Sequence, residues 1–567
     1  MMNRTTRLFV RRLASGSLVA SACAIGFAST GQTQVLGPLV QVTGADPFTS
    51  CTKDNVHQQE TTFGSFLYPN TSIEPWVAVD PTDPSRLLVG HQQDRWSDGG
   101  ARSDIDALSN DGGATWTNAI PPNPPGVTEC TGGKDARASD PWTAFANDGT
   151  ALFLSLVLDP AKPTTPFGAR HSGVLVSRSA DHGATWGSPV ALITNNSPHV
   201  LNDKTSMTAD PTENGLVYAA WDQLSVFPPS DAGAAVLAQN EGIPIARELL
   251  NSKAGASAVC VPFTKPPCKG GAPFFKFNFT GPSLLAISAD NGVTWRSPAA
   301  IYSPGTNAQT IDNLVQVTPN GNVYDFFTAI NAPTPGALNI GYVWSANKGI
   351  GWSPPTFVTD IQVAGVVSPD SGQPLRDASI LFAVSANPVN GAIYLTWQDD
   401  RFTATTCTTP TGTIPIDGIA FAQSLDGGAT WSTPVQINKT PANATNPCRE
   451  QAFIPAVVAT GDGKSVVVTY YDFRNDTNTP AGFEGTDYFA IFCLTASDCS
   501  NPANWGNEQK LTEASFNILD APVARGHFLG DYMGLAASGA TTVYPVFGIA
   551  TAPNTTAEYT RSISGLP

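Results

Sequence analysis

Short apolar runs alternate with turn residues along almost the whole chain. Residues 74–94 show the pattern in full, because the run EPWVAV turns through DPTDPSR into LLVGHQQD. Two extended segments joined by a turn rich in Asp and Pro are typical of a β-hairpin. The same arrangement recurs at residues 140–156, 203–222, 312–327, 377–399, 450–472 and 531–547. No long stretch has the spacing of an amphipathic helix, so the pattern predicts an all-β chain.

A second hairpin follows most of these, and its turn is an octapeptide with the spacing Ser-x-Asp-x-Gly-x-Thr-Trp. The full copies are residues 109–116 (SNDGGATW), 179–186 (SADHGATW), 288–295 (SADNGVTW) and 424–431 (SLDGGATW). Residues 345–352 (SANKGIGW) are a partial copy, and Ser497, Asp498 and Trp505 form a trace of another. This repetition indicates one array of similar units, not several unrelated domains.

Two hairpins per unit give four antiparallel strands, and radial repetition of such sheets is a β-propeller. The first hairpin occurs seven times, so we predict seven blades, with six as the alternative if residues 531 onward only close the array. The last unit has no octapeptide. Because residues 37–42 (GPLVQV) are similar to residues 432–437 (STPVQI), we expect an N-terminal strand to complete the C-terminal blade.

Strand direction predicts where function should lie. The octapeptides join third to fourth strands at one end of the blades, so the starts of the first strands meet at the other end. These starts carry the acids Glu74, Asp140, Asp203, Asp312, Asp377, Glu450 and Asp531. Converging carboxylates need protons, cations or basic partners. Nearby bases are Lys204, Arg376, Arg449, Arg525 and His527.

Two interpretations of these acids remain open. Oxygen ligands suit calcium, so Asp140, Asp203, Asp312, Asp377 and Asp531 are candidate ligands of a cation in the channel. Alternatively, the acids cap strand ends and bind the backbone amides of neighbouring blades.

The ends of the second strands add a second set of candidates. Arg95, Arg401 and Arg474 follow an aspartate at similar offsets, as in Asp94-Arg95. Arginine binds planar carboxylates through paired N–H groups, so the three could hold an acidic sugar. The alternative is that each arginine pairs with its own neighbouring aspartate and fixes a loop.

The octapeptide pattern resembles the Asp-box, or BNR, repeat of the bacterial sialidase superfamily, over nearly all of the chain after residue 32. The resemblance implies a β-propeller and a glycosidase of exo-alpha-sialidase type, in which the octapeptide is a structural turn. It also implies three arginines on the substrate carboxylate, a tyrosine nucleophile with a glutamate helper, and an aspartate acid.

The residues here that fit these roles are Arg95, Arg401 and Arg474 for the clamp, with Arg376, Arg449 and Glu74 as further substrate contacts, Tyr532 or Tyr471 as nucleophile, Glu450 or Glu74 as helper, and Asp94 as acid. At one position this chain differs from the family in a way that affects the clamp. The family's first arginine lies in an Arg-Ile-Pro motif, whereas this chain has Ile73-Glu74-Pro75, and the carboxylate there would repel an anionic sugar.

Composition narrows the partners and the compartment. The formal net charge of -16 repels phosphate backbones and anionic lipid, so nucleic-acid binding and membrane docking are disfavoured. Residues 1–32 combine early arginines with an apolar run and read as a signal peptide. We therefore predict a secreted or periplasmic monomer that binds carbohydrate, with residues 33–567 as its propeller.

Eight cysteines remain after residue 32, an even number in a compartment that permits disulfides. Pairing neighbours in order gives Cys51 with Cys130, Cys260 with Cys268, Cys407 with Cys448, and Cys493 with Cys499. A zinc site is disfavoured because no paired Cys-x-x-Cys or His spacing accompanies them. Residues 223–282 interrupt the third unit and are expected to form an insertion on the functional face.

The leading hypothesis is a secreted, sialidase-like glycoside hydrolase acting on acidic sugars. A polysaccharide lyase is the first alternative, with His527, Tyr532 or His91 as base. The second is a non-catalytic binding propeller, whose acids and arginines would be paired with one another. No cofactor is required by these hypotheses, apart from the possible calcium ion.

Overall fold

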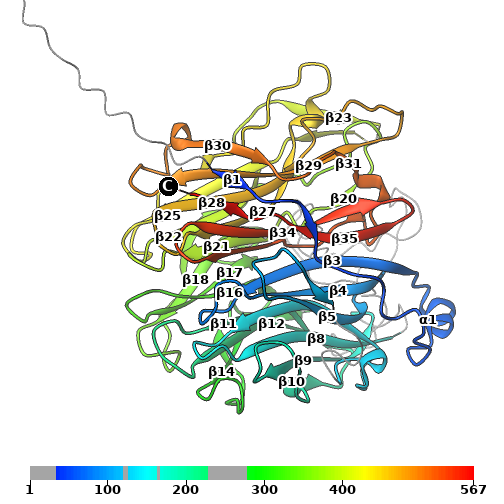
Figure 1. Cartoon of the computed structure of the whole chain (residues 1–567), viewed down its shortest axis with the longest axis vertical. Helices are drawn as coiled ribbons and strands as arrows, with labels where there is room; N and C mark the ends of the chain where they lie inside the picture. The colour runs from blue at the N-terminus through cyan, green and yellow to red at the C-terminus, as the bar shows by residue number, and fades with distance from the viewer. Residues whose placement is uncertain (1–33, 119–125, 162–166, 228–277, 411, 567) are drawn as a thin grey trace, which may run out of the picture.

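The computed structural model describes residues 34–118, 126–161, 167–227, 278–410 and 412–566 (Figure 1). Strands dominate it, and its one α-helix in the described residues, α1 (Val56–Phe63), lies outside the sheets. The all-β prediction is confirmed. The proposed signal peptide, most of the 223–282 insertion, and Cys260 with Cys268 lie outside the described residues.

Successive strands pair with their neighbours along the chain to form antiparallel sheets, arranged as in a β-propeller. Near the N-terminus these are β3 (Leu67–Val79), β4 (Leu87–Trp96), β5 (Ala101–Ser109) and β6 (Thr117–Asn118), then β7 (Arg137–Phe145), β8 (Ala151–Pro160), β9 (Ala169–Ser179) and β10 (Val190–Asn195). Next come β11 (Val200–Ala209), β12 (Val217–Phe227), β14 (Ser283–Ser288) and β15 (Ala299–Tyr302), then β16 (Ala308–Val317), β17 (Val323–Ile330), β18 (Leu338–Ser345) and β19 (Thr356–Asp360).

The C-terminal sheets repeat this order. They are β21 (Phe382–Ala386), β22 (Ile393–Asp399), β25 (Gly418–Ser424) and β26 (Val435–Gln436), then β27 (Ala452–Ala459), β28 (Ser465–Asp472), β29 (Gly485–Leu494) and β30 (Trp505–Lys510), and finally β33 (Gly534–Ser538), β34 (Thr542–Thr551) and β35 (Thr555–Thr560). Strand β2 (Val40–Gln41), from the other end of the chain, pairs antiparallel with β35. The two ends of the described chain therefore share one sheet.

The register fixes which loops share an end of the sheets. Leu87 opens β4 and pairs both with Val79, the last residue of β3, and with Ser109, the first residue of an octapeptide. The octapeptides therefore lie at the same end as the first hairpin turns, which we call the octapeptide end. The starts of the first strands lie at the opposite end, which we call the loop end.

The octapeptides form closed turns whose polar side chains bind their own backbone. Ser109 Oγ accepts the N–H of Gly113 at 2.9 Å, and Asp111 accepts both the N–H of Thr115 at 2.9 Å and its hydroxyl at 2.6 Å. The equivalent bonds form around Asp181, Asp290 and Asp426. These aspartates are occupied by the turn, as expected for a structural element.

Five of the first strands contain a β-bulge with a residue in the left-handed region. In four of them this residue is charged: Glu74, Asp140, Lys204 and Asp312 have φ between 46° and 64°, and the register of each strand shifts around them. A bulge re-aims side chains and is common beside functional sites. These charged positions therefore stand at equivalent places in successive sheets.

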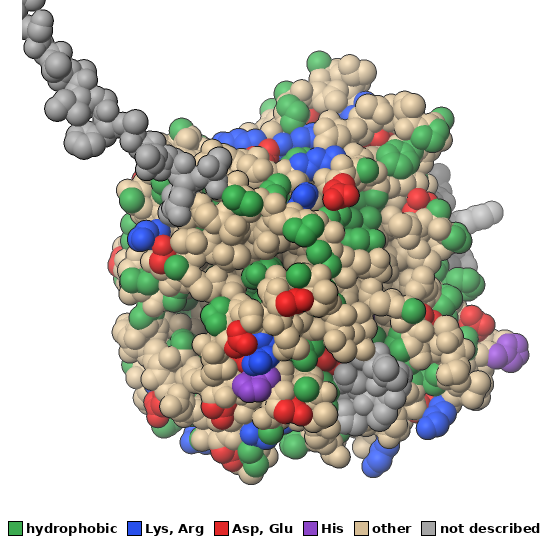
Figure 2. Space-filling view, viewed as in Figure 1, with side chains coloured by type: hydrophobic (Ala, Val, Ile, Leu, Met, Phe, Trp, Pro, Cys, Tyr) green, Lys and Arg blue, Asp and Glu red, His purple; other side chains and the backbone are tan. Residues whose placement is uncertain are grey.

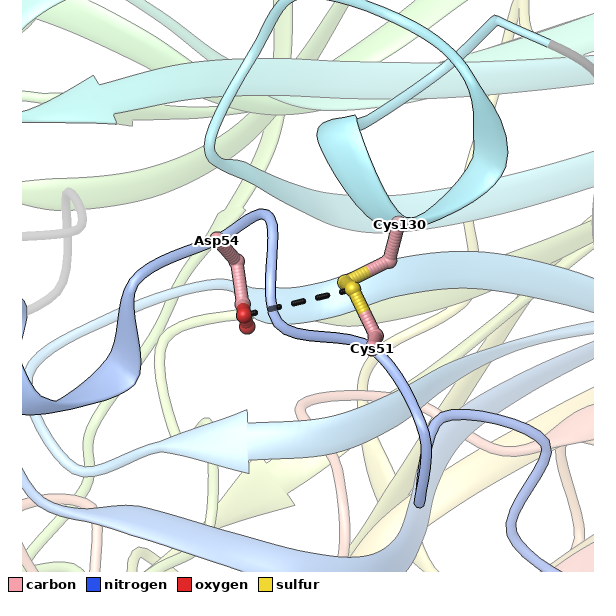
Figure 3. Close-up of side chains that lie close together, drawn as sticks. All are labelled: Cys51, Asp54 and Cys130. Carbon is pink, nitrogen blue, oxygen red and sulfur yellow. Dashed lines mark hydrogen bonds between the residues drawn. A yellow bond between two sulfur atoms is a disulfide. The ribbon is translucent and has the colours of Figure 1, made fainter.

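Three of the predicted disulfides are confirmed: Cys51–Cys130, Cys407–Cys448 and Cys493–Cys499. Figure 3 shows the first, which joins the segment before α1 to the loop after β6, with the Asp54 carboxylate beside it. Within the described residues, no helix is long and apolar enough to cross a membrane. On the face seen in Figure 2, acidic, basic and hydrophobic side chains are scattered among backbone and other side chains.

Candidate active site

The first strands of successive sheets surround one cavity of about 260 Å³, which we call the central cavity. Each of these strands contributes to its wall: Trp76 of β3, Trp142 of β7, Met207 of β11, Leu314 of β16, Phe382 of β21, Ala456 of β27 and Leu535 of β33. The wall is therefore mostly apolar. Cavities of this kind with a few converging polar groups are the usual form of a small-molecule site.

Aromatic side chains form one side of the central cavity. The rings of Trp76 and Trp142 stack with centroids 3.4 Å apart and 21° between their planes, and Tyr532 meets them at 6.1 and 5.6 Å. The Tyr532 hydroxyl donates to the carbonyl of Pro141 at 3.1 Å. Burial raises the pKa of Tyr532 far above its usual value, so this phenol is neutral.

Three carboxylates line the same cavity: Asp312, Asp377 and Asp531. Asp377 and Asp531 precede the first residues of β21 and β33, so the acids gather toward the loop end. Asp377 accepts the N–H of Val366 at 2.6 Å, and Asp312 accepts that of Phe382 at 3.0 Å. The cavity is thus apolar along its wall and acidic toward the loop end.

Asp531 is an ionised carboxylate held between two buried cations. It accepts the Nε–H of Arg376 at 2.9 Å and an N–H of the Lys204 ammonium group at 2.6 Å, and it is 3% exposed. Burial alone would raise the pKa of Asp531, but the charges and hydrogen bonds of Arg376 and Lys204 outweigh it and lower that pKa. Asp531 therefore remains charged at neutral pH.

Asp312 and Glu74, in contrast, keep their protons up to near-neutral pH. Burial raises the pKa of Asp312 to about 7 and that of Glu74 to about 8, although Lys204 counteracts both shifts. Glu74 accepts the backbone N–H of Asp531 at 3.2 Å, so a carboxyl that favours its proton lies directly beside an ionised one. Such neighbouring carboxyl groups with pKa values pushed apart are the arrangement used for acid and base roles.

The stability of the fold is predicted to fall as the pH rises from 6.5 to 8. Burial raises the pKa of Glu74 to about 8 and those of Asp94, Asp312, Asp325 and Asp417 to about 7. The unfolded chain has already lost these protons, so the native state binds more protons and loses stability as they dissociate. Thermal unfolding at pH 6.5 and at pH 8 tests this.

This pH window separates the raised acids from His91 and His527. Burial lowers the pKa values of these two histidines, so they oppose the effect only below their ordinary value of about 6.5. Asp135 raises the pKa of His171, so this histidine acts in the same direction as the acids. Glu74→Gln, which removes one of the raised groups, should reduce the difference in Tm between the two pH values. A Tm that is higher at pH 8 would contradict the prediction.

The three arginines proposed for a carboxylate clamp are each occupied within the protein. Arg401 donates to both oxygens of Asp399, at 2.6 and 2.7 Å. Arg474 donates to Asp472 at 2.6 Å and also pairs with Glu508. Arg401 and Arg474 therefore each pair with the neighbouring aspartate, which is the alternative to a clamp on a ligand.

Arg95 is buried in a different environment. It donates to Gln92 at 2.7 Å, and its guanidinium lies 5.1 Å from the centre of the Phe528 ring. None of the three arginines is among the described residues that line the central cavity.

The remaining residues predicted for catalysis lie away from the central cavity, except Tyr532. Tyr471 is in the hydrophobic core and donates to the carbonyl of Gly548 at 2.8 Å. Asp94 is buried, accepts the N–H of Asn70 at 2.9 Å and faces Arg102. Glu450 lies in the 3-10 helix η2 (Pro447–Glu450) and accepts the N–H of Asn443 at 2.7 Å.

Two of the acids proposed for calcium face the ammonium group of Lys204, which lies 2.6 Å from Asp531 and 3.7 Å from Asp140. Asp140 also accepts the backbone N–H of Lys204 at 2.9 Å, and Asp531 also binds Arg376. Among the described residues, the groups close enough to share one ion are instead Asp370 with Asp476 and Glu484, and Cys51 with Asp54 and Cys130. In the second group the sulfurs form a disulfide, as Figure 3 shows, so they offer no thiolate.

The histidines proposed as lyase bases do not line the central cavity. His91 is 1% exposed in β4, and its Nδ1 lies 3.2 Å from the carbonyl of Gln92. His527 lies in β32 (His527–Phe528), 3.2 Å from the Gln373 side chain.

Sequence reasoning missed the tryptophan pair. A signal was present, because the tripeptide acid-Pro-Trp occurs at residues 74–76 and again at 140–142. Sequence reasoning also missed that Ile454, not Glu450, is the bulge residue of β27. Glu74, Asp140 and Ile454 are each followed by a proline, so aligning the strands on that proline would have shown it.

No family model matches the chain, and no curated protein was found to match it. Solved structures match it over most of its length at low identity. They include the Hadza microbial sialidase Hz136 (13% identity, TM-score 0.40, 84% of this chain and 74% of that one) and the intramolecular trans-sialidase from Ruminococcus gnavus (12%, 0.41, 76% and 94%). The GH93 alpha-L-arabinofuranosidase of Fusarium graminearum matches at 12% with a TM-score of 0.38, covering 75% and 92%. Likeness at this level carries no argument about activity.

Proposed function

We propose that this protein is a glycoside hydrolase whose sugar site is the loop end of the central cavity. The observation that carries the proposal is the pairing of a protonated and an ionised carboxylate on one aromatic-walled cavity. Glycosidases use two carboxyl groups in these two states, one to protonate the leaving oxygen and one to assist the attack. Asp312 has the raised pKa that suits the acid, and Asp531 stays ionised.

Each of these side chains would have a separate role in hydrolysis. The stacked Trp76 and Trp142 would position the apolar face of a sugar ring. Asp312 would donate its proton to the glycosidic oxygen as the bond to the anomeric carbon breaks. Asp531 would take a proton from the water molecule that attacks this carbon, and the proton would return to Asp312 through solvent after product release. Arg376 and Lys204 hold Asp531 in place and keep it ionised. A neutral sugar fits best, because the charged side chains among the described residues of the cavity wall are all acidic.

We also propose that the propeller has seven blades and is closed by the N-terminal strand. Two observations support this. The central cavity is lined by β3, β7, β11, β16, β21, β27 and β33, and strand β2 adds to the sheet of β33, β34 and β35. A ring closed in this way places both acids on one enclosed axis.

Hydrolysis is best tested with a panel of neutral aryl glycosides, sialosides and uronate polysaccharides. We expect release of a neutral sugar, and Asp312→Asn should lower kcat by about 10²-fold to 10⁴-fold. Activity should also fall above pH 7, because Asp312 must keep its proton. Asp325→Asn is the matched control, since Asp325 is buried with a pKa of about 7 and lies outside the cavity wall.

The other outcomes discriminate among the alternatives. Release of sialic acid that is lost in both Tyr532→Phe and Arg401→Ala would replace this proposal with the sialidase-type mechanism. An unsaturated product from uronate polymers would indicate a lyase. Binding without turnover of any substrate would indicate a non-catalytic propeller.

A further inference from the structure

A second cavity, of about 410 Å³, opens between loops, and we call it the loop pocket. Its wall comes from β23 (Thr406–Thr409), from the segment leading into η2, and from the residues around Asp370. Polar side chains dominate this wall: Asp370, Thr406, Thr408, Thr445, Asn446 and Arg449. It shares no lining residue with the central cavity.

The loop pocket is held in a fixed shape. The Cys407–Cys448 disulfide is fully buried and joins β23 to η2. In the sequence, Cys407 stands between the lining residues Thr406 and Thr408, and Cys448 directly precedes the lining residue Arg449. Asn446 donates to the carbonyl of Pro369 at 3.1 Å, which ties the third wall to the second. Preorganised walls reduce the entropy lost when a ligand binds.

Several donors and acceptors in this pocket are available to a ligand. Arg449 donates from Nε to Asp476 at 2.8 Å and from Nη2 to Asp370 at 2.9 Å, so its plane is fixed. Its Nη1 donates to none of the described residues, and neither do the hydroxyls of Thr406 and Thr445, which are exposed. A bound molecule would therefore meet a fixed N–H group and two hydroxyl groups.

The charge around the pocket selects the ligand class. Asp370, Asp476 and Glu484 lie within 4.8 Å of one another, measured between carboxylate oxygens, and Arg449 is the cation that pairs with two of them. The excess of negative charge disfavours anions. Hydroxyl groups of a neutral ligand can both accept from Arg449 and donate to Asp370. Neutral sugars have this chemistry.

We propose that the loop pocket is a second, non-catalytic subsite for a neutral glycan chain whose end enters the central cavity. This inference rests on the proposed hydrolase function. Asp370 of the pocket and Asp377 of the cavity are seven residues apart in one segment, which limits their separation to about 25 Å even for an extended chain. One short oligosaccharide can reach both sites.

Binding of neutral linear oligosaccharides of one to six units, measured by calorimetry on the full chain, tests the subsite. In Thr406→Val/Thr445→Val, which removes two exposed hydroxyls that bind none of the described residues, the hexasaccharide should bind about ten-fold more weakly. Binding of the monosaccharide and turnover of aryl monoglycosides should not change. Thr405→Val is the matched control, because Thr405 is an exposed neighbour that does not line the pocket.

The outcomes separate this inference from the proposed function. Turnover of glycosides together with unchanged hexasaccharide binding in the double variant would overturn the subsite and leave the hydrolase. Hexasaccharide binding that the double variant weakens, with no turnover of any glycoside, would support the subsite and overturn the hydrolase. Tighter binding of an acidic hexasaccharide than of a neutral one would overturn the ligand class.

Discussion

Asp531→Asn is expected to destabilise the folded chain by about 3–5 kcal/mol. Asp531 accepts hydrogen bonds from Arg376 and Lys204, and those side chains are 6% and 3% exposed. Removing the carboxylate charge takes away the anion that these two buried cations share and leaves Lys204 with the more distant Asp140 at 3.7 Å, which is far more costly than losing a surface ion pair. The midpoint and slope of urea unfolding measure the change.

Two further variants make this result interpretable. Arg170→Ala breaks an exposed ion pair with Asp159 and should cost less than about 1 kcal/mol, because Arg170 is 70% exposed. Adding Lys204→Met to Asp531→Asn removes one of the two buried cations that lose this anion and should restore part of the lost stability. If Asp531→Asn cost no more than Arg170→Ala, the carboxylate would not be the anchor of this network.

Most of the architecture could be predicted because its signals are local. A period-two apolar pattern and the octapeptide specify strands and a turn within about ten residues, and the turn's hydrogen bonds are made by its own side chains. Cysteine pairs that are neighbours in the sequence were also predictable. Blade packing then places the starts of the first strands around one axis, so the acidic character of that end followed from the sequence.

The partners of the charged groups could not be predicted in the same way. Whether Arg401 faces a ligand or Asp399 depends on the rotamers of two residues that are two positions apart, and no pattern in the sequence encodes that choice. Lys204 reaches Asp531 across 327 positions. Such a contact depends on how sheets far apart in the sequence pack together, which lies beyond any local signal.

A shift of a few residues also separates the prediction from the structure in one blade. Glu450 was assigned to the start of a first strand, but residues 447–450 form a 3-10 helix, and the strand begins at Ala452. The bulge residue there is Ile454, so this blade supplies no acid to the ring. Short helices of this kind depend on tertiary packing, here including the disulfide at Cys448.

Removing the Cys51–Cys130 disulfide, by Cys51→Ser/Cys130→Ser, should cost about 4 kcal/mol. The bridge closes a loop with a sequence separation of 79, so it removes much of the entropy of the unfolded chain. Cys493→Ser/Cys499→Ser is the matched control, because its separation of 6 predicts only about 2 kcal/mol. Urea unfolding of both variants should therefore rank them in this order. The opposite order would mean that native contacts near these bridges, such as the pairing of Asp54 with Arg102 beside Cys51, decide the effect instead of loop length.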